Sequence, residues 1–260
     1  MDLGIRGRHA LVCGGSKGLG YAAAESLARE GVNLTLAART AAPLDDAAAQ
    51  LRTEHGVAVE TVAADLGTAD GRAAVLAACP DPDILVANPG ARQTPAGFRS
   101  LERADWDAWL ETHFFAAWEL IRAVTPGMCA RGFGRIVNIS VSFIKFPQVN
   151  FAHSHAARLA LAGAIASTAR ELVRHNVVIN SVLPGFFDTE ALQTNLHGHA
   201  ARGGVTYEAI VEDRLRSTPA GRFADPAECG DLIAFLCSAQ NGYMTAQNIV
   251  NDGGVYQGLF

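Results

Sequence analysis

The sequence predicts a doubly wound α/β fold, in which helices cover both faces of an open, mostly parallel sheet. Short apolar runs alternate with longer helical patterns from one end of the chain to the other. Several of the short runs are almost continuously apolar, as expected of parallel strands that are buried on both faces. Such alternation indicates right-handed strand–helix–strand units.

The seven expected strands are His9–Cys13, Val32–Ala38, Ala58–Ala64, Ile84–Ala87, Arg135–Ser140, Val177–Leu183 and Gln247–Val250. The expected helices are Leu19–Glu30, Leu44–Glu54, Ala69–Ala78, Arg103–Arg131, His153–His175 and Pro226–Ser238. Because the alternation is unbroken, we expect residues 1–260 to form one domain. The polar stretch Glu190–Arg222 interrupts it, either as a surface excursion or as a lid over a ligand.

Composition narrows the class of protein. The formal net charge of −5 argues against a nucleic-acid partner. No apolar run is long enough to span a bilayer, so we expect no membrane partner. The five cysteines are scattered without metal-ligand spacing, which predicts no metal site and favours the reducing cytoplasm.

The most informative motif follows the first expected strand and opens the first expected helix. It reads Cys13-Gly14-Gly15-Ser16-Lys17-Gly18-Leu19-Gly20. Glycines let the backbone turn tightly and approach a pyrophosphate, whose charge is stabilised at a helix N-terminus. The motif therefore predicts a dinucleotide site.

The end of the second strand indicates which nicotinamide cofactor is bound. Folds that bind NAD place an acidic residue there for the ribose 2′-hydroxyl. This chain instead has Ala38 followed by Arg39, and Arg39 with Lys17 can pair with a 2′-phosphate. We therefore expect NADP(H). After the third strand, Asp65, followed by Leu66, is placed to accept a hydrogen bond from the adenine amino group, although a turn residue would look the same.

Together these motifs resemble the short-chain dehydrogenase/reductase family over essentially the whole chain. Gly14, Gly18 and Gly20 have that family's glycine spacing, and Asn88-Pro89-Gly90 stands where the family has Asn-Ala-Gly. Pro184-Gly185 and Thr189 match the segment beside the nicotinamide, and Asp252-Gly253-Gly254 matches the C-terminal Asp-Gly-Gly. The resemblance implies a Rossmann-type sheet of order 3-2-1-4-5-6-7, and a homodimer or homotetramer built partly on the two long helices.

The family's catalytic positions are altered. The family uses a tyrosine and a lysine four residues apart, a serine thirteen residues earlier, and an asparagine on the preceding helix. Alignment of the helix that contains both residues places Ser154 at the tyrosine and Arg158 at the lysine. It places Val141 at the serine, beside Ser140, and His113 at the asparagine. No shift restores the motif, because no tyrosine lies on that helix.

Serine is a much weaker acid than a phenol, and arginine stays protonated, so Arg158 can orient or stabilise an anion but cannot relay a proton. Ser154 and Arg158 still share a helical face. His113, His153 and His155 supply groups that titrate near neutrality, and each is also compatible with a structural role. Phenylalanines 143, 146, 151, 186 and 187 lie in segments that border the family's pocket, and indicate either an apolar or aromatic small-molecule substrate or ordinary core packing.

Three functional hypotheses follow from the altered site. In the first hypothesis, the chain is an NADP(H)-dependent oxidoreductase that acts on a carbonyl or hydroxyl group with a non-standard proton donor. Alternatively, it is a catalytically inactive subunit that partners an active relative. In the third hypothesis it is a non-redox enzyme (a dehydratase, isomerase or lyase) on the same scaffold.

Overall fold

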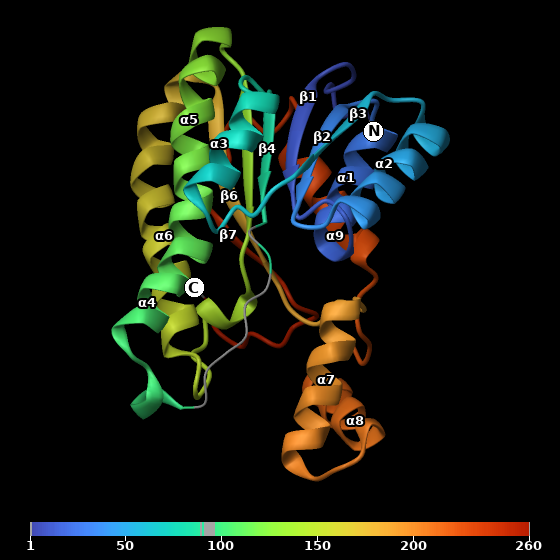
Figure 1. The fold of residues 1–260 in the computed structure, drawn as a ribbon, viewed down its shortest axis with the longest axis vertical. Helices are drawn as coiled ribbons and strands as arrows, with labels where there is room; N and C mark the ends of the chain where they lie inside the picture. The colour runs from blue at the N-terminus through green and yellow to red at the C-terminus, as the bar shows by residue number, and fades with distance from the viewer. Residues whose placement is uncertain (1, 89, 91–96, 260) are drawn as a thin grey trace.

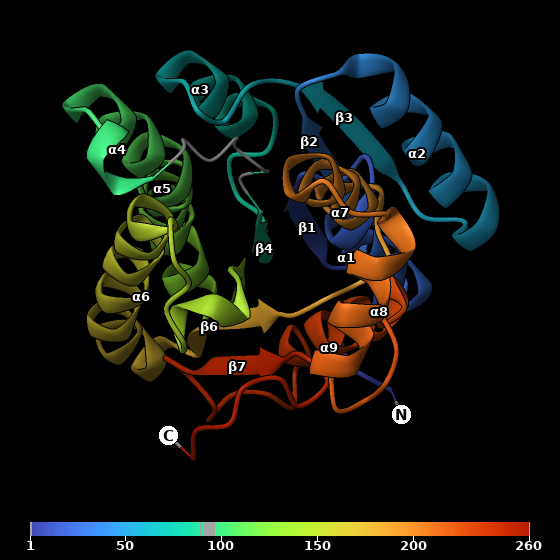
Figure 2. The same ribbon diagram turned by 90° about the horizontal axis from the view of Figure 1, so that it is seen from below.

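The computed structural model describes residues 2–88, 90 and 97–259 and contains one seven-stranded sheet. The strand order is β3-β2-β1-β4-β5-β6-β7, and neighbouring strands pair in parallel throughout. Helices cover both faces (Figures 1 and 2). The predicted fold class and the order implied by the resemblance are both confirmed.

The strands lie within one or two residues of their predicted bounds. They are β1 His9–Cys13, β2 Asn33–Ala38, β3 Val59–Ala63, β4 Ile84–Ala87, β5 Gly134–Ile139, β6 Val177–Pro184 and β7 Asn248–Asn251. Along β1 the side chains alternate between two cores, because successive residues of a strand point to opposite faces. Ala10 and Val12 pack into one core, whereas Leu11 and Cys13 pack into the other.

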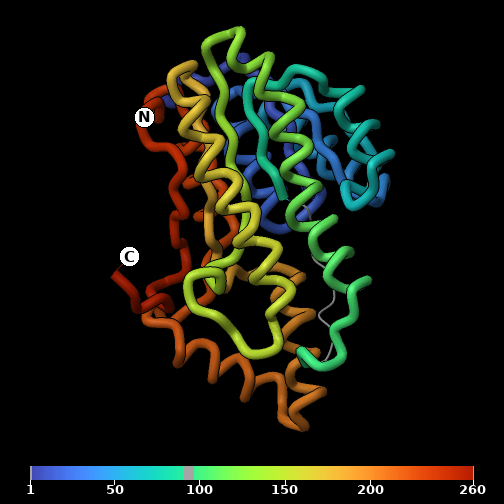
Figure 3. Tube along the Cα trace, turned by 90° about the vertical axis from the view of Figure 1, so that its left-hand side faces the viewer, coloured from blue at the N-terminus to red at the C-terminus, as the bar shows by residue number. Residues whose placement is uncertain are grey.

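Each core is closed by its own set of helices. On one face lie α1 (Gly18–Arg29), α2 (Ala41–His55) and α9 (Pro226–Leu236). On the other lie α3 (Ala69–Ala78), α5 (Ala116–Arg131) and α6 (Ala152–Leu172). Figure 3 shows α5 and α6 side by side along the outside of the molecule. Among the described helices, none is both long and apolar enough to cross a lipid bilayer.

The structure divides the expected helix Arg103–Arg131. It consists of α4 (Arg103–Leu110), a π-helical segment Glu111–Phe115, and α5. The widened turn carries His113 and buries its side chain, which is 1 % exposed. Such π-helical insertions are frequent at functional sites. The chain is therefore helical over the whole predicted range, and only the π-helical turn within it was not predicted.

The polar stretch after β6 is helical. It forms α7 (Glu190–Gly203) and α8 (Tyr207–Ser217), which extend beyond the end of the sheet in Figure 1. Threonine side chains cap both helices, Thr189 on the backbone N–H of Leu192 and Thr206 on that of Ala209.

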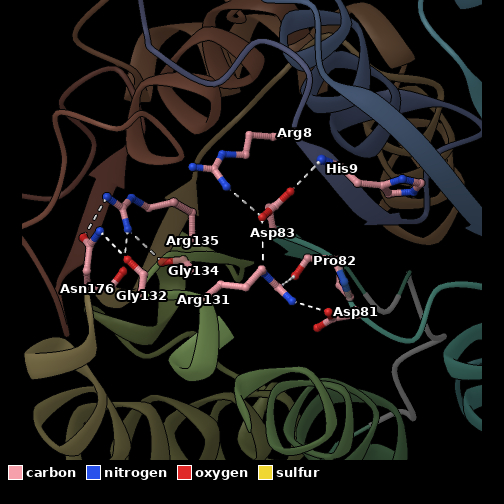
Figure 4. A network of polar contacts seen from close by, with 10 residues as sticks. All are labelled: Arg8, His9, Asp81, Pro82, Asp83, Arg131, Gly132, Gly134, Arg135 and Asn176. Atoms are coloured by element: carbon pink, nitrogen blue, oxygen red, sulfur yellow. Dashed lines mark hydrogen bonds and ion pairs between the residues drawn. The ribbon is translucent and has the colours of Figure 1, made fainter. Parts of the chain in front are cut away.

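A polar network fixes the opposite edge of the sheet, where the strands begin (Figure 4). The Asp83 carboxylate accepts hydrogen bonds from the His9 backbone N–H at 3.0 Å and from Arg8 at 3.1 Å, and Arg131 lies 3.4 Å away. These contacts join β1, β4 and the end of α5. Beside them the fully buried Arg135 donates to the carbonyls of Gly134, Asn176 and Ser238. Its charge is thus held by carbonyl oxygens in place of a carboxylate.

We predict that Asp83→Ala lowers the free energy of unfolding by about 2–3 kcal/mol, because charge-assisted bonds are lost and Arg8 loses its carboxylate partner. Urea denaturation followed by circular dichroism measures it. The matched control is Asp81→Ala, because Asp81 is more exposed and pairs only with Arg131, and its cost should be about 0–1 kcal/mol. Equal costs for the two variants would contradict the role given to Asp83.

Candidate functional site

The predicted site residues gather at the edge where the parallel strands end. The chain order reverses between β1 and β4, and at this switch point open α/β sheets bind their ligands. The glycine loop follows β1, Asn88 follows β4, and Thr189 follows β6. A Cβ on Gly14 would lie 2.7 Å from the Asn88 side-chain nitrogen, and one on Gly18 would lie 3.7 Å from Thr189. The loop, Asn88 and Thr189 therefore lie together at this edge.

The glycine loop requires its glycines. Gly14 and Gly18 adopt φ values of +65° and +58°, which side chains rarely tolerate. A Cβ on Gly20 would lie 2.1 Å from the Gly14 carbonyl oxygen. The backbone thus turns sharply and brings the first turn of α1 against the end of β1, with Ser16, Lys17 and Leu19 between the glycines.

The start of α1 fits a phosphate group. No side chain caps α1, and its first turn contains no acidic residue. Threonine or aspartate side chains cap α3, α7, α8 and α9, whereas α2 and α6 share the uncapped start of α1 but do not follow a glycine loop. Uncapped N–H groups at a helix N-terminus suit an anion. The described residues therefore fit the dinucleotide predicted from the sequence.

Arg39 and Lys17, the two cations expected to bind a 2′-phosphate, differ from each other in their surroundings. Arg39 is exposed at the end of β2 and forms no ion pair within the described part of the chain. Lys17 Nζ lies 2.6 Å from a carboxylate oxygen of Glu190, the first residue of α7, and both side chains are largely exposed. Sequence reasoning missed Glu190, because the two residues are far apart in the chain and no motif links them.

The remaining predicted cofactor residues line the same edge. Asp65 accepts a hydrogen bond from the backbone N–H of Gly67 at 2.9 Å, which is the turn role that the sequence left open. Leu66 is buried, and its carbonyl accepts a hydrogen bond from Arg72.

Gly90 has φ +90° with open space where a Cβ would be, and Pro89 lies outside the described residues. Pro184 ends β6, and a Cβ on Gly185 would lie 2.6 Å from that of Asp252, so the C-terminal Asp-Gly-Gly packs against this segment.

Three of the predicted catalytic residues are joined by hydrogen bonds. The Arg158 guanidinium donates from Nε to Ser154 Oγ at 3.3 Å and contacts His113 Nδ1 at 3.1 Å through NH1. Ser154 and Arg158 lie one turn apart on α6, and His113 comes from the π-helical segment. The structure thus assembles residues that are up to 45 positions apart in the sequence.

These contacts fix the direction of the hydrogen bonds. A guanidinium only donates, so Nδ1 of His113 must accept, and the neutral ring carries its proton on Nε2. Ser154 likewise accepts from Arg158, which leaves its own hydroxyl hydrogen to be donated to another oxygen. Arg158 is half-buried, and burial lowers its pKa to about 10, so it remains charged at neutral pH. No carboxylate of a described residue forms an ion pair with it.

Aromatic and imidazole rings surround these residues. The Trp109 ring packs against His113 at 4.7 Å and against His153 at 4.5 Å between ring centroids. His153 is 1 % exposed, and neither of its ring nitrogens has a hydrogen-bond partner in the described structure. Burial lowers the pKa of His153, and burial followed by the Arg158 charge lowers that of His155. No sequence motif singled out Trp109.

Two predicted residues stand apart from the others. Ser140 is buried at the end of β5, and no hydrogen bond joins it to Ser154 or Arg158 among the described residues. Phe187 is 4 % exposed and belongs to the core beneath α1 and α9, so it does not border a pocket. Its neighbour Phe186 points to the other side and remains half-buried.

Comparison with known proteins was made over the whole chain. The family model described as Enoyl-(Acyl carrier protein) reductase matches residues 14–256. A solved structure titled as a short chain dehydrogenase/reductase family protein is 30% identical and covers 98% of this chain and 99% of its own, with a TM-score of 0.83. The chain belongs to the short-chain dehydrogenase/reductase family.

Among its similar proteins is L-sorbose reductase of Gluconobacter frateurii, solved with NADPH and L-sorbose. It is 30% identical, with a TM-score of 0.92 and full coverage of both chains. Gluconate 5-dehydrogenase of Gluconobacter oxydans is 31% identical over 96% of this chain and 95% of its own. The (2S)-[(R)-hydroxy(phenyl)methyl]succinyl-CoA dehydrogenase subunit BbsC of Thauera aromatica is 33% identical over 98% of this chain and 96% of its own. The family is thus one of oxidoreductases.

We predict that acid destabilises the protein partly through His153. Its pKa in the folded state lies below the unfolded value of about 6.5, so below that pH the unfolded chain binds the proton more readily. The resulting loss approaches about 1.4 kcal/mol per pH unit for each such histidine. In thermal melts from neutral to mildly acidic pH, His153→Phe should lose less stability than the wild type. His175→Phe, at an exposed site, is the control, and a wild-type-like slope for His153→Phe would refute the assignment.

Proposed function

We propose that this short-chain dehydrogenase/reductase is an NADP(H)-dependent oxidoreductase acting on a carbonyl or hydroxyl group, in which Ser154, Arg158 and His113 replace the family's tyrosine, lysine and asparagine. The observation that carries the proposal is the Arg158 guanidinium, which contacts both Ser154 and His113. A half-buried cation bound to a serine hydroxyl and a neutral imidazole forms a polar centre near the start of α6, which follows β5 as the glycine loop follows β1.

The cofactor supplies a hydride when it is bound, and the chain must supply the proton. Ser154 is placed to donate its hydroxyl hydrogen to the substrate oxygen, and the positive charge of Arg158 stabilises the serine oxygen as it loses that hydrogen. His113, held by Arg158 through Nδ1, carries its proton on Nε2. An imidazole in this tautomer can donate a hydrogen bond from Nε2 to the substrate oxygen and so orient it, while Ser154 supplies the proton. Because serine is a weak acid, this centre should be slower than a tyrosine on simple ketones.

The phosphorylated cofactor is supported by the two cations near the glycine loop. Arg39 stands where an acidic residue would otherwise bind the 2′-hydroxyl, and Lys17 is already paired with a carboxylate oxygen of Glu190. A 2′-phosphate could take the place of that carboxylate on Lys17 and also pair with Arg39. The solved relative bound to NADPH is consistent with this choice. We take helices α7 and α8, which begin at Glu190, as the lid.

One observation favours the second candidate function, that of an inactive subunit. A relative that is 33% identical bears the name of a dehydrogenase subunit. Half-exposed apolar side chains on the outer helices, Phe115 at 40 % and Leu159 at 48 %, are compatible with either a homo-oligomer or assembly with an active relative. On either account we place the protein in the cytoplasm, with no nucleic-acid or membrane partner.

We predict that the protein binds NADPH about tenfold more tightly than NADH, because Arg39 and Lys17 can pair with the extra phosphate. Titration calorimetry with both cofactors measures the two dissociation constants. The double variant Ala38→Asp with Arg39→Ala should reverse the order. Equal affinities in the wild type would contradict the cofactor assignment.

We also predict that Ser154→Ala lowers kcat for carbonyl reduction by about 10²-fold or more, because positioned acid–base groups contribute about that much. Arg158→Met should do the same, while the dissociation constant of NADPH changes by less than about threefold. Ser167→Ala, at an exposed position of the same helix, is the control. NADPH oxidation under steady-state conditions provides the rates, and wild-type turnover in both active-site variants would rule out this centre.

A further inference from the structure

Six aromatic rings form a contiguous cluster at the edge of the sheet that carries the proposed site. The chain of ring contacts runs through Phe143 to Phe146, Phe151 and Phe186, at centroid distances of 5.3, 6.4 and 6.2 Å. Phe146 stacks on Tyr256, and Phe186 contacts Phe223, at 6.0 and 6.3 Å. We call Phe143, Phe146, Phe151, Phe186, Phe223 and Tyr256 the aromatic cluster.

The cluster adjoins the centre around Ser154. Phe151 is the residue before α6, and its ring lies 6.3 Å from that of His155, the neighbour of Ser154. Phe143 belongs to the short helical turn after β5, and Phe186 to the loop after β6. The rings therefore come from separate segments that meet at the carboxyl ends of the strands, where this class of fold binds ligands.

None of the six rings is fully buried, although the sheet offers two closed cores nearby. Phe187, in the same loop as Phe186, is completely packed into one of those cores. Aromatic rings that are gathered together but left half-exposed beside a polar centre are typical of the walls of a ligand site.

Two basic side chains lie beside the aromatic cluster and form no ion pair with a carboxylate of the described residues. The guanidinium carbon of Arg214 lies 5.6 Å from the centre of the Phe186 ring, and Lys145 Nζ lies 5.9 Å from that of Tyr256. Both side chains are half-buried, and neither forms an ion pair in the described part of the chain. The other half-buried or buried basic side chains of the described residues are Arg8, Arg72, Arg135 and Arg158. Of these, Arg8 and Arg72 pair with carboxylates, and Arg135 is bound by carbonyls.

Among the residues that the structure describes, the half-buried cations that form no ion pair are thus Lys145, Arg158 and Arg214, and all three lie around the aromatic cluster and Ser154. The protein as a whole is acidic, with a formal net charge of −5, so this local excess of positive charge runs against its composition. Partial burial makes an unpaired cation costly, and an anionic ligand would offset that cost.

From this arrangement we infer that the substrate carries an aromatic ring, which packs on the aromatic cluster, and a carboxylate, which pairs with Arg214. The inference rests on the proposed function, because it names the substrate of that same centre. A guanidinium can bind a carboxylate through two parallel hydrogen bonds, which also fixes the orientation of the ligand. Arg214 belongs to α8, so a bound carboxylate would also tie this helix to the site.

Binding of three small probes tests the inference without requiring turnover. Benzoylformate has both a ring and a carboxylate, acetophenone has only the ring, and pyruvate has only the carboxylate. By titration calorimetry on the full chain, with and without NADPH, benzoylformate should bind about tenfold more tightly than either of the others. Affinities within about twofold for all three probes, or no binding of benzoylformate, would overturn the inference.

Two variants then test separately the binding of the ligand's ring and the binding of its carboxylate. Phe143→Leu should weaken benzoylformate about fivefold and leave pyruvate unchanged, since it removes a ring from the centre of the cluster. Arg214→Gln should weaken benzoylformate about tenfold and leave acetophenone unchanged. The matched controls are Phe98→Leu, at a ring outside the cluster, and Arg216→Gln, at an exposed position of α8 paired with Glu212. Thermal melts confirm that each variant is folded. Unchanged benzoylformate binding in Phe143→Leu or Arg214→Gln would contradict the assignment.

The same measurements distinguish failure of this ligand inference from failure of the proposed oxidoreductase function. If benzoylformate binds as expected but NADPH is never oxidised in its presence, the ligand class stands and the oxidoreductase proposal fails. If NADPH is oxidised by neutral aliphatic ketones while benzoylformate does not bind, the oxidoreductase proposal stands and the ligand class fails.

Discussion

The reversal of strand order between β1 and β4, in a sheet whose strands are all parallel, is the constraint on which the rest of the structure depends. Strands built outward from β1 in both directions end at one edge, so loops from distant parts of the chain must meet there. At this switch point the chain leaves β1 for α1 on one face of the sheet and leaves β4 for α5 on the other face. The glycine loop, Asn88 and Thr189 are neighbours for this reason, and the far edge can be closed by the Asp83 network without affecting the site.

At the edge where the strands end, the dominant electrostatic feature is Arg158, a cation that forms no ion pair with a carboxylate of the described residues. Arg158 is held by a serine hydroxyl and an imidazole, both weaker partners than a carboxylate, and burial lowers its pKa to about 10. Its charge is therefore available to an oxygen that becomes negative during a reaction, or to an anionic group of a ligand.

Sequence patterns predicted the sheet well, because strands buried on both faces leave unmistakable apolar runs, and β1 and β4 have their predicted bounds. Glycine spacing located the loop for a similar reason, since Gly20 has no room for a Cβ. Periodicity could not reveal the π-helical turn at His113, which adds a residue to one turn and leaves the apolar pattern on either side intact. Nor could it pair Lys17 with Glu190, or tell the buried Phe187 from the half-exposed Phe186, because these depend on how loops pack in three dimensions.

The central claim is that Ser154 and Arg158 serve the reacting oxygen in place of a tyrosine and a lysine. The most direct measurement is the distance from Ser154 Oγ to the oxygen of a bound carbonyl compound, in a crystal structure of the protein with NADPH and benzoylformate. The account predicts a hydrogen bond between these two oxygens, with Arg158 still bonded to Ser154. A carbonyl oxygen bound elsewhere, or crystals that take up no NADPH at saturating concentration, would contradict it.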